Sequence, residues 1–180
     1  MFDYAAPMPR RKIIPDTEVF ALVRTLLNEG GDKAVAFGPV ARASGLAAST
    51  LVQRFQSRDA MVQAALNDGW DRLDEACAAA EANAPTNAKG ASAFLKEVGA
   101  ATADGSTLAL LAADFRDPVL RDRAAAWRAR VETALAVRLG GGEKGRETAA
   151  LIFAAWMGQV FWQPAGGKAF KLKDLFRRLT

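Results

Sequence analysis

The sequence of 180 residues contains no histidine, one cysteine and one tyrosine. Without histidine the protein cannot build a Ser-His-Asp or Cys-His nucleophile, or a zinc site with imidazole ligands. The lone Cys77 excludes an intrachain disulfide, on which small exported domains often depend. These absences favour a reducing compartment and exclude the commonest forms of nucleophilic catalysis.

Long hydrophobic runs are also absent. The longest, Ala149–Gly158, is too short to cross a bilayer, and the N-terminus MFDYAAPMPRRKIIPD lacks the apolar segment of a signal peptide. We therefore expect a cytoplasmic protein without a membrane partner.

The sequence has no Walker-type phosphate loop, and its glycine cluster GGGEKG at Gly140–Gly145 follows a helical pattern. We interpret this cluster as a helix stop and linker. The acidic residues are scattered over helical faces, which is typical of solvated surface. We therefore expect no enzyme activity, no catalytic residue, no cofactor and no metal ligand.

Apolar residues recur at a period near 3.6, and no hairpin signal separates alternating runs, so the pattern predicts an all-α fold. The expected helices cover 16–30, 39–44, a second short segment ending near 55, a long segment from Ser57 to a break near Pro85, then 91–103, 106–114, 118–139 and 143–161. A basic amphipathic segment follows, with a docking face of Phe170, Leu172, Leu175, Phe176 and Leu179.

Two long helices carry clear apolar stripes. The first stripe consists of Met61, Leu66, Trp70, Leu73, Cys77 and Ala80. The second consists of Leu120, Ala124, Trp127, Val131, Leu135 and Leu139. The helix at 143–161 is instead apolar nearly all round, which indicates burial on every side and a second subunit as the outer cover. The residues expected at that dimer interface are Ile152, Trp156, Gln159 and Val160.

The stretch ARASGLAASTLVQRFQSRDA, from Ala41 to Ala60, combines small residues with three arginines and has no acid before Asp59. Two short helices joined at Gly45 after a longer first helix match a helix-turn-helix arrangement. The window from Lys33 to Arg58 holds four cations and no acid, which equals the formal net charge of +4 of the whole chain. Such local positive charge favours binding to phosphates.

This stretch resembles the DNA-binding motif of tetracycline-repressor-type (TetR family) regulators. The positions in register with that motif are Ala41, Gly45, Leu46, Thr50, Leu51, Phe55, Ser57 and Asp59, and the resemblance extends over about 19–61. Four positions depart from the pattern. Val52 replaces the usual tyrosine, Arg54 replaces a histidine or tyrosine, Arg58 replaces a lysine, and Ala36 replaces a threonine cap.

The resemblance implies a helix-turn-helix domain at 1–60, with an arm at 1–14, followed by a helical regulatory and dimerisation domain at 61–180. The expected DNA-contacting residues are Arg42, Ala48, Ser49, Thr50, Gln53, Arg54 and Arg58. The two arginines at 54 and 58 suit phosphates, Gln53 suits adenine, and the Thr50 methyl group suits thymine. Arg10, Arg11 and Lys12 are compatible either with an arm on DNA or with a solvated tail.

The resemblance also implies a ligand pocket in the second domain. Bulky residues from different helices are the candidates for its lining: Trp70, Phe94, Val98, Leu111, Phe115, Trp127, Phe153 and Met157. The function expected is a homodimeric regulator of transcription, typically a repressor, that a hydrophobic or aromatic small molecule releases from double-stranded DNA. Two alternatives remain open: a DNA-binding architectural protein without a ligand, and a helical enzyme or lipid carrier with a relic helix-turn-helix.

Overall fold

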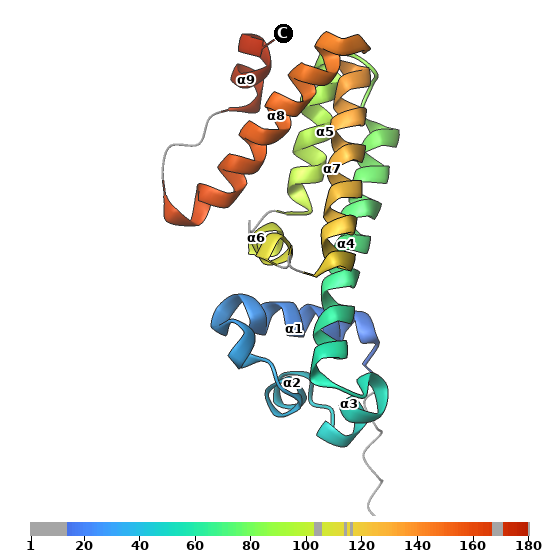
Figure 1. The fold of residues 1–180 in the computed structure, drawn as a ribbon, viewed down its shortest axis with the longest axis vertical. Helices are drawn as coiled ribbons and strands as arrows, with labels where there is room; N and C mark the ends of the chain where they lie inside the picture. Colours follow the sequence, from blue (N-terminus) through green and yellow to red (C-terminus); the bar gives the residue numbers. More distant parts are fainter. Residues whose placement is uncertain (1–13, 103–105, 114, 116, 167–170, 180) are drawn as a thin grey trace, which may run out of the picture. The chain divides into compact units, whose positions relative to one another are not determined.

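The computed structural model describes residues 14–102, 106–113, 115, 117–166 and 171–179. These residues form α-helices, two short 3-10 helices and the turns that connect them, so the predicted all-α class is confirmed (Figure 1). The helices are α1 Asp16–Gly30, η1 Asp32–Ala34, α2 Phe37–Ser44, α3 Ala48–Phe55, α4 Arg58–Asn83, α5 Ala88–Ala100, α6 Ser106–Ala113, α7 Pro118–Arg138, α8 Gly142–Trp162, η2 Gln163–Ala165 and α9 Leu172–Leu179. None of these helices is both long and apolar enough to cross a membrane.

The chain forms two compact units, the first ending at Ala65 and the second beginning at Leu66. The long helix α4 contains this boundary. The assignment of DNA binding to 1–60 and of regulation to 61–180 stays a prediction, and the basic arm at Arg10–Lys12 lies outside the described residues.

The first unit packs α1, α2, α3 and the start of α4 around a small apolar core. Val19, Val23, Val40 and Leu51 are fully buried there, because each helix turns its apolar stripe inward. The ring of Phe55 on α3 lies 5.6 Å from the ring of Phe20 on α1. These contacts hold α3 by one face only, and its opposite face stays exposed.

Side-chain caps start several of the helices. Ser57 Oγ accepts a hydrogen bond from the backbone N–H of Ala60 at 3.0 Å, as the sequence predicts for the start of α4. Asn87 Oδ1 accepts one from Gly90 N–H at 3.0 Å, and this cap starts α5 three residues before the expected position. Ala36 precedes α2 without any side-chain cap.

A tight turn at Gln56 joins α3 to α4. Gln56 is the one non-glycine residue of the described chain with a positive φ, at 64°, and its ψ is −47°. Ser57 N–H donates to Phe55 O at 2.7 Å across it, which makes the turn a γ-turn with left-handed φ. Such turns are rare and strained for residues with a side chain. The end of α3 is therefore held in a constrained geometry.

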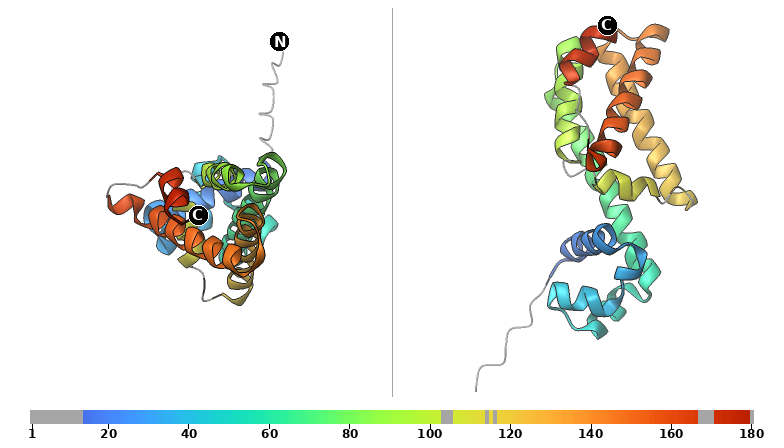
Figure 2. Two further views of the ribbon diagram at one scale, coloured as in Figure 1. Left: turned by 90° about the horizontal axis from the view of Figure 1, so that it is seen from above. Right: turned by 90° about the vertical axis from the view of Figure 1, so that its left-hand side faces the viewer.

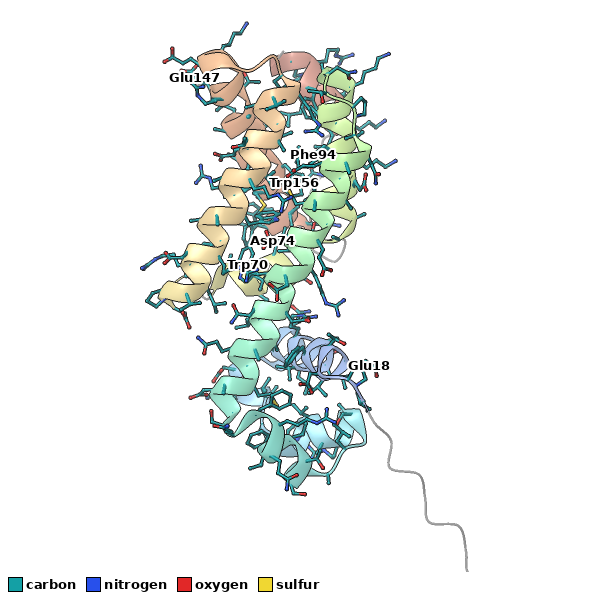
Figure 3. The ribbon with its side chains drawn as sticks, turned by 90° about the vertical axis from the view of Figure 1, so that its right-hand side faces the viewer. Glu18, Trp70, Asp74, Phe94, Glu147 and Trp156 are labelled. Atoms are coloured by element: carbon teal, nitrogen blue, oxygen red, sulfur yellow. The ribbon has the colours of Figure 1, made fainter. Side chains whose placement is uncertain are left out.

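The second unit packs α4 from Leu66 onward with α5, α6, α7, α8 and α9, and its most extensive helix–helix contact joins α7 to α8 (Figure 2). Both predicted stripes face its interior, apart from Leu139, which is half-buried, and Met61, which is buried in the first unit. Figure 3 shows Trp70, Phe94 and Trp156 between the helices of this unit and Glu147 on its outside.

The glycine cluster after α7 is only partly a linker. Gly140 and Gly141 have φ values of 92° and 67°, which few other residues adopt, and they make the reversal into α8. The helix begins already at Gly142, so the expectation that all of Gly140–Gly145 is linker is wrong. A Cβ added at Gly145 would lie 3.3 Å from Ala136 O, so the missing side chain permits the close approach of α7 and α8.

The C-terminal helix α9 contacts α5 and α8, and it buries Phe176, as its amphipathic pattern predicts. Leu172 and Leu175 are half-buried. Phe170 lies outside the described residues, as does the side chain of Leu179.

Cys77 lies on the buried stripe of α4, where its thiol donates to Glu81 Oε1 at 3.4 Å. Burial, with the nearby Glu81 carboxylate, raises the pKa of this thiol to about 12. An unfolded cysteine has a pKa of about 8.5, so the folded chain keeps this proton as the unfolded chain loses it. The stabilising contribution is complete below about pH 8.5 and is lost as the pH rises toward 12.

We therefore expect Cys77 to resist alkylation by iodoacetamide at pH 8 in the folded protein and to react rapidly in denaturant. The free energy of unfolding of the wild type should fall more steeply above pH 9 than that of Cys77→Ala. Both are measured by thiol labelling and by chemical denaturation across pH. Rapid labelling under native conditions would contradict the buried position.

Candidate functional sites

The turn between α2 and α3 has the geometry of a helix-turn-helix. Gly45 has φ 73° and ψ 12°, and its N–H donates to Ala41 O at 2.9 Å, so the chain leaves α2 through a left-handed residue. The hydroxyl of Ser44 then accepts a hydrogen bond from Leu46 N–H at 3.2 Å. The two helices are thereby joined at a defined angle, with Leu51 and Phe55 anchoring α3 to the core.

The outer face of α3 is uncharged and made mostly of small side chains. Ala48, Ser49, Val52 and Gln53 are exposed, whereas Thr50 is half-buried. Arg42 on α2 is exposed as well. Five of the seven predicted DNA-contacting residues therefore lie beside the turn, four of them exposed and Thr50 half-buried. Val52, which was not predicted to contact DNA, is exposed among them. Whether they bind DNA stays a prediction.

The other two predicted positions, Arg54 and Arg58, have partners inside the first unit. Arg54 donates to Ile14 O at 2.7 Å and to Asp16 Oδ1 at 3.0 Å. Arg58 donates to Val35 O at 2.9 Å and forms ion pairs with Asp32 and Asp59. The hydrogen bond to Asp32, and then the one to Asp59, raise the pKa of the Arg58 guanidinium.

These contacts change the meaning of the acid-free window. No acid lies inside the window, yet folding places aspartates from outside the window against two of its four cations. Arg54 and Arg58 therefore help to hold α3 and the start of α4 against α1 and η1, a role that the sequence did not predict. Lys33 and Arg42 remain as cations of the window without an ion pair to a described residue.

A cavity of about 390 Å³ lies within the second unit. Its aromatic lining consists of Trp70, Phe115, Trp127, Phe153 and Phe161. The remaining lining consists of Leu108, Met157, three alanines at 112, 124 and 125, and two arginines, Arg121 and Arg128. Five of the eight predicted pocket residues therefore line one cavity. Phe94, Val98 and Leu111 do not line it, because they are fully buried elsewhere in the core.

Trp127 lies at the centre of the aromatic cluster beside this cavity. Its ring centroid is 6.0 Å from those of Trp70 and Phe153 and 6.3 Å from that of Trp156. Its Nε1 donates to Leu73 O at 3.4 Å. The indole is thereby held against both α4 and α8, and a molecule in the cavity would touch it.

The residues predicted for the dimer interface point mainly into the chain itself. Ile152 is fully buried, Trp156 retains 5% of its exposure, and Val160 is also buried. Gln159 is half-buried, and its Oε1 has no hydrogen-bond partner among the described residues. These side chains cover the aromatic cluster and the core, so they do not form the outer surface of α8. In the single chain the outer side of α8 is uncovered, and the expectation that a second subunit covers it stays a prediction.

The outer face of α8 is formed by a different set of residues. Leu151 is 60% exposed and Trp162 is 71% exposed. Ala154, Ala155 and Gly158 lie between them at helical spacing, and the segment 148–163 contains no charged residue. A helix this long with an apolar, uncharged outer stripe is typical of a surface that another subunit covers.

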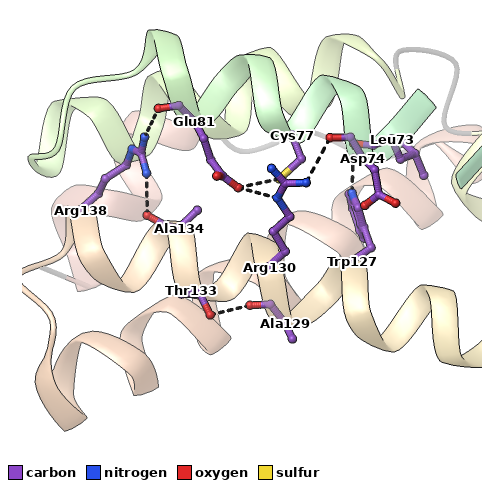
Figure 4. A network of polar contacts seen from close by, with 10 residues as sticks. All are labelled: Leu73, Asp74, Cys77, Glu81, Trp127, Ala129, Arg130, Thr133, Ala134 and Arg138. Atoms are coloured by element: carbon purple, nitrogen blue, oxygen red, sulfur yellow. Dashed lines mark hydrogen bonds and ion pairs between the residues drawn. The ribbon is translucent and has the colours of Figure 1, made fainter. Parts of the chain in front are cut away.

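Sequence reasoning missed a polar network between α4 and α7 (Figure 4). Arg130 donates to Glu81 Oε1 at 2.7 Å, and this hydrogen bond is the main cause that lowers the pKa of Glu81. Arg138 is buried, donates to Glu81 O at 2.9 Å and to Ala84 O at 3.0 Å, and stacks on the Phe94 ring at 5.0 Å. It thus binds the free carbonyls at the end of α4. Cations are favourable near helix C-termini, but Arg138 lies 54 residues or more from the end of α4 in the sequence, so this preference could not identify it as the partner of α4.

No protein-family profile and no curated protein sequence match the chain. Solved structures do match. A transcriptional regulator from Rhodococcus sp. Rha1 is 19% identical with a TM-score of 0.69, and the match covers 92% of each chain. A putative transcriptional regulator from Saccharomonospora viridis, solved in complex with choline, is 15% identical with a TM-score of 0.70, covering 91% of this chain and 92% of that chain.

A TetR/AcrR-family transcriptional regulator from Thermobifida fusca YX-ER1 is 18% identical with a TM-score of 0.61, covering 91% of this chain and 95% of that chain. These matches cover more than nine tenths of this chain, so both units contribute to them. The protein therefore has the fold of TetR/AcrR-family transcriptional regulators, as the helix-turn-helix resemblance predicts.

Proposed function

We propose that this protein, which has the fold of TetR/AcrR-family regulators, is a homodimeric DNA-binding regulator of transcription that a small molecule releases from its operator. The observation that carries the proposal is the position of α3. Its inner face is anchored by Leu51 and Phe55, and its outer face exposes Ser49 and Gln53 beside the turn at Gly45. A short helix held in this way is suited to the major groove.

In this proposal α3 reads bases and its neighbours bind the backbone. Gln53 suits the paired hydrogen-bonding groups of adenine, and the small side chains of Ala48 and Ser49 let the helix backbone approach the groove. Arg42 binds a phosphate, since it is exposed and has no ion pair with a described residue. Arg54 and Arg58 chiefly position α3, and a phosphate could replace their aspartate partners only by competing with bonds already made.

The ligand acts through α4, the helix that carries both Met61 of the first unit's core and Trp70 of the cavity wall. A molecule that fits the cavity better in one arrangement of the two units shifts the population toward that arrangement. If the two α3 helices of the dimer are then too close together or too far apart for the two half-sites of the operator, DNA affinity falls. By linkage it falls by the same factor by which DNA lowers ligand affinity. The choline complex of the Saccharomonospora viridis structure supports a ligand-binding role for this fold.

The dimer forms through the outer stripe of α8, defined as Leu151, Ala154, Ala155, Gly158 and Trp162. A stripe on one helix can pack against its own copy about a two-fold axis, and such isologous contacts are the commonest kind. The space around Gly158 is open, so a second backbone can approach closely there. Two subunits would then present two copies of α3 to a palindromic operator.

We expect the full chain to select a palindromic sequence from random double-stranded DNA and to bind it with a strong salt dependence. Arg42→Ala should weaken binding to every duplex and reduce the slope of log K against log salt by about one unit. Gln53→Ala should mainly relax sequence preference at one position in each half-site. Fluorescence anisotropy across salt concentrations, with selected and scrambled duplexes, measures both effects.

Arg146→Ala is the matched control, because Arg146 is exposed on α8 in the second unit. It should leave the affinity and the salt slope unchanged. Equal effects of the three substitutions on every duplex would contradict the assigned roles. Absence of salt-sensitive DNA binding by the wild type would overturn the proposed function and favour the helical enzyme or carrier.

A further inference from the structure

We propose that the cavity beside Trp127 binds an organic anion, a molecule with an aromatic or aliphatic body and a carboxylate or similar acidic head. The inference rests on the proposed function, since it assigns a chemical class to the ligand of the same cavity. It is carried by the charges at the cavity wall. Among the described lining residues the only ionisable side chains are Arg121 and Arg128, and none is acidic.

The two arginines occupy one face of α7. They are seven residues apart, which is close to two helical turns, and Ala124 and Ala125 of the same lining lie between them. Arg121 is exposed and forms no ion pair with a described residue. Its guanidinium is therefore available to an anionic head at the edge of the cavity.

Arg128 is only partly engaged within the chain. Its Nε donates to Glu132 Oε1 at 2.7 Å, and its guanidinium carbon lies 5.7 Å from the centroid of the Phe153 ring. The contact with Phe153 orients the planar group at the cavity wall. Its two terminal nitrogens have no hydrogen-bond partner among the described residues and match the two oxygens of a carboxylate.

The inner part of the cavity suits an apolar body. Trp70, Trp127 and Phe153 present ring surfaces there and are almost fully buried, so they lose little freedom when a ligand enters. Aromatic walls alone would also suit an organic cation. In this cavity the two guanidinium groups oppose a cation. The described carboxylate paired with one of them, Glu132 with Arg128, lies outside the lining, and Arg121 has no ion pair with a described residue. Charge therefore decides in favour of an anion.

The test compares three probes of similar size with the full-length protein: phenylbutyrate, its neutral amide phenylbutyramide, and the cation phenylpropyl-trimethylammonium. Binding is measured by isothermal titration calorimetry and by quenching of tryptophan fluorescence, to which Trp127 contributes. We expect phenylbutyrate to bind about ten-fold more tightly than the amide, which is the scale of one charge-assisted hydrogen bond, and more tightly still than the cation. Added salt should reduce this preference.

Two variants identify the source of the preference. Arg121→Gln and Arg128→Gln should each lower the affinity for phenylbutyrate several-fold and leave the affinity for phenylbutyramide nearly unchanged. Arg146→Gln, on an exposed part of α8 away from the lining, should change neither. Because Arg121 has no ion pair with a described residue to lose, its variant separates ligand binding from folding, and circular dichroism verifies the fold.

The outcomes are distinct. Equal or tighter binding of the cation, or a preference for the anion that persists in both arginine variants, would overturn the proposed ligand class while the cavity remains a binding site. If none of the probes binds, the ligand class is overturned as well. Salt-sensitive DNA binding is measured separately, so its failure would overturn the proposed function whatever the probes do.

Discussion

Substitution of Gly90 by alanine is expected to lower the free energy of unfolding by about 3 kcal/mol or more. Gly90 lies in the first turn of α5, where a Cβ would come within 1.6 Å of Pro85 O and 2.6 Å of Pro85 C. These are backbone atoms and cannot rotate away. The clash is relieved only if the backbone at Pro85 moves away from the start of α5. This movement also breaks the hydrogen bond from Gly90 N–H to Asn87 Oδ1. Chemical denaturation followed by circular dichroism measures the loss.

Gly99→Ala in the same helix is the matched control. A Cβ at Gly99 would lie 3.6 Å from Trp156 Nε1, an ordinary van der Waals distance. Alanine is favoured over glycine in a helix by about 0.8–1 kcal/mol, so this variant should be as stable as the wild type or slightly more stable. A similar loss of unfolding free energy in both variants would contradict the prediction, because it would show that the contact with Pro85 is not the cause of the loss at Gly90.

Substitution of Leu151 by glutamate is expected to weaken dimerisation by more than about 100-fold and to reduce operator affinity by a similar order. Leu151 is 60% exposed at the N-terminal end of the uncharged outer stripe of α8. In a dimer across a two-fold axis, each new carboxylate would be buried away from water and would lie near the same carboxylate of the partner subunit. The loss of hydration and the repulsion between like charges both oppose dimerisation. In a single chain the same carboxylate would face water, so the fold should persist.

Analytical ultracentrifugation and light scattering at micromolar concentration measure the oligomeric state, and anisotropy measures DNA affinity. Val119→Glu is the control, because Val119 is 55% exposed on α7 but lies outside the stripe. It should remain dimeric and bind DNA. A Leu151→Glu protein that stays dimeric would exclude the outer stripe of α8 as the interface, and dimerisation would then have to use another face.

Local features of this protein could be predicted from the sequence because their causes are local. Apolar residues at a period near 3.6 predicted the stripes of α4 and α7, and Ser57 predicted the start of α4. Gly45 marked the turn of the helix-turn-helix, since a left-handed residue at the end of a helix is a short-range requirement. Five of the eight predicted pocket residues line one cavity for a related reason: bulky side chains on the inner stripes of neighbouring helices must meet in the interior.

The tertiary structure decided which charges are free and which apolar face is outward. Arg54 and Arg58 stand in an acid-free stretch of sequence, yet folding brings Asp16 and Asp32 to them from 38 and 26 residues away. Along α8, composition alone did not separate Ile152 and Trp156, which are buried in the chain, from Leu151 and Trp162, which are exposed. Both decisions depend on the positions of residues distant in sequence. A helix with apolar residues on every side has no periodicity that identifies its inner face, and an ion pair across helices leaves no trace in the spacing of either partner.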